Sequence, residues 1–439
     1  MIDAPPNRLQ RIIGVRRDEL AAVVWSWLFF FCVCFAYYVI RPIRDDMAVA
    51  SGVDNLPWLF TGSLAGMLLA NPGFAFLAAR LPRARYVRVS YRIFALNLLI
   101  FSLAFGFGSG AQAIWAGRLF FVWTSVFNMF VVSIFWSVMS DVFSPPQSAR
   151  LFGIIGAAGT VGGIAGAAFT SALAGMFGPG YLLLVPAIVL EVGAWASWRL
   201  FAEARRQSPS SAADRHDALL GGGVWEGFRR AMTSPYLLNI SLHMLFFTVL
   251  TTLLYFQQAT LVDAAYATRA ERTRFFANVD LTVNVLTLFT QVFATGRLVQ
   301  MFGLTASLVF LPAISAIGFV VLGATPTIAV LVIFQVLRRA GNFAVARPAR
   351  ETLFTVVSRE DRYKAKSFID TFVYRAGDQV GAWTFAPLAT FGMSVGEISS
   401  IAAVLAAVSI VNAFWLGRRA RTAAADAVAA VPEPTVDSI

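Results

Sequence analysis

Residues 20–40 read LAAVVWSWLFFFCVCFAYYVI, an apolar run that decides the fold of this protein. The run has no charged residue and about the twenty residues that an α-helix needs to cross the hydrocarbon core of a bilayer. Lipid offers no hydrogen-bond partners, so the backbone amides must bond within the segment, as they do in a helix. The run is also too long for the core of a signal peptide. We therefore predict a retained membrane-spanning helix.

Similar apolar stretches recur along the chain. Hydrophobic residues make up 58% of the sequence and charged residues 13%, against roughly 45–50% and about 25% in soluble domains. The predicted spans are residues 20–40, 56–79, 89–108, 113–139, 151–175 and 181–201, then 236–262, 276–300, 304–323, 327–346, 367–390 and 395–416. The fold class is thus an all-α integral membrane protein with twelve transmembrane helices in two six-helix bundles.

Polar segments separate and flank these bundles. We expect a cytoplasmic N-terminus at residues 1–19, an N-terminal bundle at 20–201 and a cytoplasmic linker at 202–235. A C-terminal bundle at 236–416 and a cytoplasmic tail at 417–439 complete the chain. The linker is rich in Ser, Gly and charge, which is typical of a solvated connection.

The arginines predict the orientation. The net charge is +11, and basic residues crowd the even-numbered gaps, as at Arg80 to Arg92. Such a bias places those gaps and both termini in the cytoplasm of a multi-pass protein, with a bacterial inner membrane as the expected location. The seventh gap, with Arg269, Arg272 and Arg274, is the exception. This placement argues against nucleic-acid binding, which needs a basic stripe.

The two halves resemble each other in their turns. Ala79-Arg80 stands at the second gap, and Gly296-Arg297 stands at the same place in the second half. Paired halves joined by a long central loop are typical of a secondary transporter with a site near the bilayer midplane.

Ionisable residues inside spans are candidate site residues, because each costs free energy unless it is paired or hydrated. The first cluster ends the first predicted span and contains Arg41, Arg44, Asp45 and Asp46. Two guanidinium groups beside two carboxylates can hold an anion and remain neutralised when it leaves. The alternative is a cluster at the membrane interface with no ligand.

Later spans carry polar stripes at helical spacing. A stripe of this kind lines either a cavity or a seam between helices. The eighth span carries Asp280, Asn284, Thr287 and Gln291, the tenth carries Gln335, Arg339 and Asn342 beside Arg338, and the eleventh carries Asp370, Tyr374 and Asp378. Arg375 stands three residues before Asp378, so we expect an intramembrane ion pair, with a structural or a gating role.

Three smaller features complete the survey. Glu191 and His243 stand alone in their spans, as packing residues or as carriers of a coupled proton. Glycines at 159, 162, 163 and 166 predict close helix packing in the fifth span. No pattern predicts a metal or cofactor site, and none of the sequence patterns indicates an enzyme.

The run Arg41-Pro42-Ile43-Arg44-Asp45-Asp46, followed by Gly52-Val53-Asp54 and then Pro57-Trp58, resembles the ATP/ADP translocase family. Further similar segments are Ser148-Ala149-Arg150-Leu151-Phe152-Gly153 and Lys366-Ser367-Phe368-Ile369-Asp370 with Arg375-Ala376-Gly377. The resemblance implies the major-facilitator fold and a twelve-helix nucleotide exchanger. It also implies that Arg41, Arg44, Asp45, Lys366 and Arg375 keep the family's character.

Three positions depart from that family. Its lysine in the second span falls at Phe60, and its Gly-Lys-Ser in the eleventh span is Gly377-Asp378-Gln379. Its glutamate in the fourth span has no match, with Thr124 or Ser125 nearest. Losing one lysine and reversing another removes roughly three units of favourable charge for a polyanion, so nucleotide exchange is disfavoured.

We therefore expect a secondary active transporter for an anionic or zwitterionic organic solute, working by alternating access between the halves. The expected substrate-binding residues are Arg41, Arg44, Asp45, Asp280, Asn284, Gln291, Arg339, Lys366, Arg375 and Asp378. Asp280, Asp378 and Glu191 are the candidate proton carriers, although exchange is also open. The alternatives are a true nucleotide antiporter and a non-transporting receptor, scramblase or assembly protein. Expected partners are a small solute and lipid, and a monomer is compatible with the sequence.

Overall fold

Long helices account for nearly all of the described chain, as the apolar runs predict. The computed structural model describes residues 15–16, 18–207, 229, 231–293, 295–357, 365–366 and 368–429. The first half contains α2 (Leu20–Ala50), η1 (Val53–Asn55), α3 (Leu56–Arg80), α4 (Arg83–Phe107), α5 (Ala111–Val142), α6 (Pro145–Leu173) and α7 (Pro179–Gln207). Residues 208–228 and 230 of the expected linker and most of the expected N-terminal segment lie outside the described residues, as does the tail beyond residue 429. Residues 202–207 of the expected linker continue α7, and residues 417–429 of the expected tail continue α16 (Val395–Ala429).

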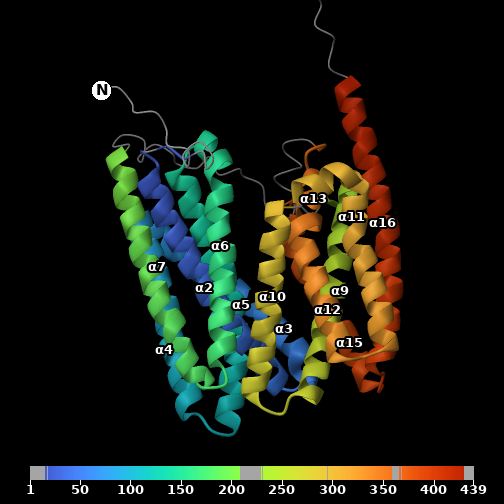
Figure 1. Ribbon diagram of the computed structural model, residues 1–439, viewed down its shortest axis with the longest axis horizontal. Helices are drawn as coiled ribbons and strands as arrows, with labels where there is room; N and C mark the ends of the chain where they lie inside the picture. The colour runs from blue at the N-terminus through green and yellow to red at the C-terminus, as the bar shows by residue number, and fades with distance from the viewer. Residues whose placement is uncertain are drawn as a thin grey trace, which may run out of the picture. The chain divides into compact units, whose positions relative to one another are not determined.

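The second half continues in the same way (Figure 1). It contains α9 (Pro235–Ala265), α10 (Arg269–Phe293), α11 (Thr295–Ala324), α12 (Ile328–Gly341), η2 (Asn342–Ala346), α13 (Arg347–Thr352), η3 (Ile369–Val373), α15 (Tyr374–Thr390) and α16 (Val395–Ala429). Among the described residues, ten helices are long and apolar enough to cross a bilayer. We assign the other two expected spans to α10 and to η3 with α15.

Two further predicted boundaries, those of the first and eighth spans, are wrong. The first span does not end at residue 40, because α2 continues to Ala50 and includes the charged cluster. The partners described below neutralise those charges, so the helix need not leave the membrane to solvate them. The eighth span does not reach residue 300, because α10 ends at Phe293 and α11 begins at Thr295. The backbone of α11 then turns at Gly303, whose φ of 73° suits a residue without a Cβ.

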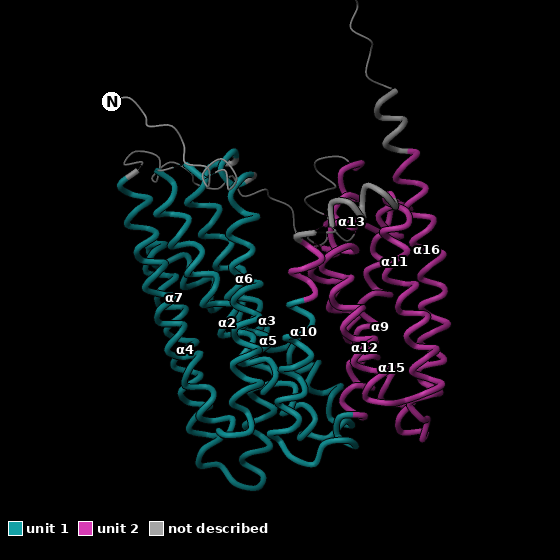
Figure 2. Tube along the Cα trace, viewed as in Figure 1, with its two compact units in different colours: residues 1–218, 262–285 teal, residues 219–261, 286–439 magenta. Residues whose placement is uncertain are grey.

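The chain divides into two compact units, Met1–Ala218 with Val262–Val285 and Leu219–Leu261 with Leu286–Ile439 (Figure 2). This division differs from the expected bundles, 20–201 and 236–416, because the first part of α10 belongs with the first unit. Ion pairs from α2 to α10 provide the physical reason, since Arg41 and Asp46 of α2 pair with Asp280 and Arg272 of α10.

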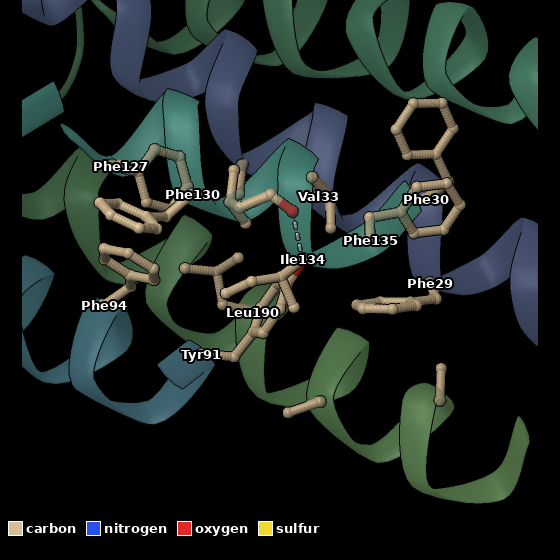
Figure 3. Close-up of a cluster of buried hydrophobic side chains, with 14 of the residues drawn as sticks. Phe29, Phe30, Val33, Tyr91, Phe94, Phe127, Phe130, Ile134, Phe135 and Leu190 are labelled. Carbon is tan, nitrogen blue, oxygen red and sulfur yellow. Dashed lines mark hydrogen bonds between the residues drawn. The ribbon is translucent and has the colours of Figure 1, made fainter. Parts of the chain in front are cut away.

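Aromatic side chains form the core of the first unit (Figure 3). Phe30 of α2 stacks on Phe135 of α5 with ring centroids 4.2 Å apart. Tyr91 of α4 is fully buried, and its hydroxyl donates a hydrogen bond of 2.9 Å to the Val131 carbonyl. The buried phenol therefore keeps a polar partner in an apolar core. This core fixes α2, α4 and α5 beside one another.

Glycines on α6 allow α2 to approach closely, as the spacing predicts. A Cβ at Gly162 would lie 2.5 Å from the Phe31 carbonyl oxygen, and one at Gly166 equally close to that of Phe35. These distances leave no room for a side chain. The α2–α6 contact consequently depends on these two positions.

A buried carboxylate joins the beginnings of α2 and α6. Glu19 accepts hydrogen bonds from Arg150 Nη2 at 2.6 Å, Gln147 Nε2 at 3.0 Å and the Arg16 backbone N–H at 3.1 Å. Burial raises the pKa of the Glu19 carboxyl, but the hydrogen bonds and the Arg150 charge outweigh it, so this pKa lies below its ordinary value. The ionised form of Glu19 thus stabilises the folded state.

In the second unit, α9 contacts α15 and α12. A Cβ at Gly377 or Gly381 of α15 would overlap Thr248 or Thr252 of α9, so these glycines permit close contact. Gln335 of α12 donates a hydrogen bond to Gln258 of α9. Side-chain hydrogen bonds between helices thus supplement apolar packing in this unit.

Candidate solute-binding site

A buried ion pair between α2 and α10 is the centre of the candidate site. Arg41 Nη1 lies 3.0 Å from Asp280 Oδ1, and Arg41 Nε lies 4.0 Å from Asp45 Oδ2. The Asp280 side chain is only 2% exposed, whereas that of Arg41 is 20% exposed. Two carboxylates therefore neutralise a guanidinium group that keeps some accessible surface.

Arg44 lies one turn beyond Arg41 on the same face of α2. Its Nη1 is 3.5 Å from Asp45 Oδ1, and its guanidinium carbon lies 4.0 Å from the centroid of the Phe121 ring. The second cation is thus held by a carboxylate and by the face of an aromatic ring. Arg41, Arg44, Asp45 and Asp280, all predicted from the sequence, come together in the first unit.

The aromatic ring under Arg44 explains one departure from the translocase pattern. Phe60 of α3, at the position of the family's lysine, lies 5.9 Å from Phe121 between ring centroids. An aromatic pair therefore occupies the region where that family has a cation. Thr124 and Ser125 both donate hydrogen bonds to backbone carbonyls of α5, so neither replaces the missing glutamate.

A second buried pair, which sequence reasoning missed, continues the network along α10. Arg272 Nε lies 2.8 Å from Asp46 Oδ1, and Arg269 Nε lies 3.8 Å from Asp46 Oδ2. Arg274 Nε instead donates to the Ser171 carbonyl at 3.1 Å. These are the three arginines that break the orientation pattern of the loops. They depart from it because they bind partners within the fold.

The polar stripe of α10 is only partly confirmed as a single buried face. Asp280, Asn284 and Thr287 are buried, but Gln291 is exposed. Asn284 Nδ2 donates to the Asp280 carbonyl at 2.8 Å. A Cβ at Gly163 of α6 would lie 3.1 Å from Asn284 Oδ1, so α6 closes one side of the stripe.

The predicted residues of the second unit form a separate arrangement. Arg375 Nη1 donates to Asp378 Oδ2 at 3.1 Å, which confirms the expected intramembrane pair. The Thr252 hydroxyl donates to Asp378 Oδ1 at 3.4 Å. Asp378 therefore lies in the seam between α9 and α15, between the two close-packed glycines.

Other predicted residues of this unit lie apart from that pair. Arg339 is half-buried on α12, next to the fully buried Arg338. Lys366 forms an ion pair with Glu351. Asp370 is exposed on η3. Among the described residues, no group of three or more His, Cys, Asp or Glu side chains could hold a metal ion.

The expectation that Glu191 stands alone is wrong. Its carboxylate lies 3.2 Å from Arg92 Nε of α4, and the two side chains are 46% and 64% exposed. Glu191 thus belongs to an ion pair on the outer face of α4 and α7, away from the Arg41 cluster. Sequence reasoning assigned Arg92 to the orientation charges of the second gap and so overlooked the pairing.

Comparisons with known proteins identify the family. A model described as Major Facilitator Superfamily matches residues 26–268, more than half of the chain. The chain belongs to the Major Facilitator Superfamily. It is therefore a multi-pass membrane transporter rather than an enzyme, as the sequence predicts.

Relatives within this superfamily agree with the resemblance to ATP/ADP translocases. ADP,ATP carrier protein 1 of Chlamydia trachomatis serovar D is 21% identical, over 89% of this chain and 86% of that protein. ADP,ATP carrier protein 2, chloroplastic, of Arabidopsis thaliana is 19% identical, over 85% and 69%. At these identities the chain is similar to ADP,ATP carrier proteins over most of its length, as the resemblance predicts.

Solved structures of other transporters share the fold. A bacterial homologue of the iron transporter ferroportin aligns with a TM-score of 0.64 at 13% identity, over 91% of this chain and 98% of its own. A bacterial homologue of the human lysosomal transporter Spinster aligns with a TM-score of 0.58 at 16% identity, over 96% and 100%. At these identities the likeness concerns the fold alone.

Proposed function

We propose that this protein is a secondary active transporter for an anionic or zwitterionic organic solute, working by alternating access. The observation that carries the proposal is the buried Arg41–Asp280 pair, with Nη1 and Oδ1 3.0 Å apart. A buried ion pair adds little stability over an apolar contact, so its retention in a membrane helix favours a functional role.

The geometry supports an anion site that is neutral when empty. Arg41 and Arg44 are 20% and 18% exposed, whereas Asp45 and Asp280 are nearly buried. A solute anion can therefore reach both guanidinium groups, and a zwitterion can place its cation beside the carboxylates. When the solute leaves, the same carboxylates restore the balance of charge. Asn284 and Gly163 bound the site on the side of α6.

Proton coupling follows because the solute anion and Asp280 compete for Arg41. An anion that binds Arg41 displaces Asp280 from the guanidinium group 3.0 Å away, and a carboxylate that loses an opposite charge in a dry site binds a proton more readily. We therefore propose proton symport with Asp280 as the carrier. Asp378, paired with Arg375, is the second candidate carrier, and Lys366, Arg339 and Gln291 remain secondary candidates for solute contact.

Nucleotide antiport is the second candidate function, favoured by the names of the chlamydial and chloroplast relatives. The aromatic pair at Phe60 and the carboxylate at Asp378 count against it, because both reduce the positive charge available to phosphates.

We also propose, from the distribution of the arginines, that both termini lie in the cytoplasm. The three exceptions, Arg269, Arg272 and Arg274, all have partners inside the first unit. A bacterial inner membrane is the proposed location, which the chlamydial relatives support.

A stability screen followed by uptake tests the proposal. Purified protein is heated with nucleotides, phosphorylated metabolites, organic acids and amino acids, because a ligand that binds only the folded state raises its unfolding temperature. We expect a shift with an anionic or zwitterionic solute other than a nucleotide, absent in Arg41→Gln, and uptake of that solute into liposomes. Uptake that survives unchanged in Arg41→Gln, or a shift with ADP alone, contradicts the proposal.

A further inference from the structure

One aromatic ring in the second unit lies beside two guanidinium groups. The guanidinium carbons of Arg338 and Arg350 are 5.4 Å and 5.8 Å from the centroid of Phe247. Phe247 in turn lies 6.4 Å from Tyr374 between ring centroids, and the Arg375 guanidinium lies 5.5 Å from the Tyr374 ring. Three cations thus surround a pair of aromatic rings contributed by α9 and by the start of α15.

Arg338 is the fixed part of this arrangement. The residue is 3% exposed, and its donors reach neutral acceptors: Ser315 Oγ at 3.2 Å, the Phe247 carbonyl at 3.2 Å and Thr251 Oγ1 at 2.6 Å. Arg338 therefore contributes a buried positive charge that no carboxylate in the described part of the chain neutralises by an ion pair. Its burial leaves no surface for a solute, so its role is electrostatic and structural.

Arg350 of α13 differs in being partly exposed. Its Nη1 lies 3.6 Å from Met244 Sδ, a weak acceptor. Asp370 and Glu351 are close enough to interact with Arg350 electrostatically, but within the described residues neither forms an ion pair with it. Glu351 is instead bound to Lys366. The guanidinium group of Arg350 thus keeps N–H donors that can bind an anion.

The charge balance of this arrangement differs from that of the first unit. There, Arg41, Arg44 and Arg272 all have carboxylate partners. Here, Asp378 is bound to Arg375, while Arg338 and Arg350 add positive charge around one ring. Low-polarity walls strengthen the field of such a cluster, which favours a bound anion.

We propose that Arg350, with the Phe247 and Tyr374 rings, forms an oxyanion-binding site of the second unit, separate from the one at Arg41 and Arg44. This site takes a carboxylate or phosphate that the guanidinium group holds bidentately. The aromatic rings hold the apolar part of that ligand next to the guanidinium group. Arg338 positions Phe247 and maintains the positive field from behind.

The test uses the full-length protein in detergent with sodium pyrophosphate and sodium citrate as probes, against sodium chloride of equal ionic strength. We expect both oxyanions to raise the unfolding temperature of the wild type and of Arg347→Gln, a control on the exposed face of α13. Arg350→Gln should weaken the apparent affinity at least tenfold, and Arg350→Lys should give an intermediate value. If Arg350→Gln does not fold, Phe247→Leu should weaken the affinity about threefold.

Two results overturn the inference. The first is that pyrophosphate or citrate fails to raise the unfolding temperature of the wild type. The second is that the apparent affinity is unchanged in both Arg350→Gln and Phe247→Leu. Failure of the proposed function has a different readout: if no solute is taken up into liposomes while oxyanion binding still depends on Arg350, the transport function is overturned and the inference stands.

Discussion

Replacing Asp280 by asparagine should separate net transport from exchange. The substitution keeps the size of the side chain but removes the negative charge 3.0 Å from Arg41 Nη1. In the empty carrier Arg41 then lacks its main counter-charge, whereas in the loaded carrier the solute anion supplies one. The empty carrier should therefore pass slowly through the closed state when it changes conformation, while the loaded carrier should pass through it at the normal rate.

The structure sets the size of this effect. At 3.0 Å and an effective dielectric constant of about 20, the pair interacts with about 5 kcal/mol. Asp45 remains 4.0 Å from Arg41 and retains part of that interaction. We take about 3 kcal/mol as the net loss, at the lower end of the values measured when a buried pair loses one partner. Water hydrates the unpaired Arg41 in an open carrier but not in a closed one, so we assign this loss to the closed state. It then corresponds to a roughly 100-fold slower return of the empty carrier.

Two flux measurements in liposomes check the prediction. Net uptake is measured into vesicles without internal solute, and exchange is measured into vesicles loaded with the same solute found in the stability screen. Asp280→Asn should lose net uptake roughly 100-fold while its exchange rate remains within about threefold of the wild type. Asp280→Glu should restore net uptake, and Thr282→Val, on the exposed side of α10, should change neither rate.

The reasoning is refuted if net uptake and exchange fall together in a variant that still binds solute. An equal loss means that Asp280 acts on the loaded carrier as well. It is also refuted if both rates are unchanged, because Asp280 is then only a structural partner of Arg41.

Three further predictions concern stability. Gly162→Ala should destabilise the protein by about 1–3 kcal/mol, because its Cβ would overlap the Phe31 carbonyl, whereas Gly156→Ala, with open space around its Cβ, should leave the unfolding temperature unchanged. Arg272→Gln should lower the free energy of unfolding by about 3–5 kcal/mol, because it leaves Asp46 without its nearest cation. Adding Asp46→Asn to the same chain should recover part of this loss, and Arg274→Gln alone should cost far less. Because the pKa of Glu19 is lowered from 4.5 in the folded state, its contribution to stability is complete above pH 4.5 and is lost as the pH falls through the lowered pKa. The unfolding temperature of Glu19→Gln should therefore lie below that of the wild type at pH 7 and approach it in acid.

The sequence alone determined the fold class, because the evidence for a membrane helix is local. A run such as residues 20–40 must satisfy its own backbone in lipid, whatever surrounds it. Helical periodicity likewise placed Arg41, Arg44 and Asp45 on one face, and predicted the Arg375–Asp378 pair three residues apart. The close-packing role of Gly162 followed from its lack of a side chain.

Partners far apart in the chain were decided by the tertiary structure. Nothing in the sequence shows that Asp280 meets Arg41, that Arg272 meets Asp46, or that Glu191 meets Arg92. These pairings depend on how each helix is rotated and shifted against its neighbours, which the close contacts at Gly162 and Gly166 and the aromatic core establish. A periodic pattern shows which face of a helix is polar, but the packing of side chains between helices decides which charge lies opposite it.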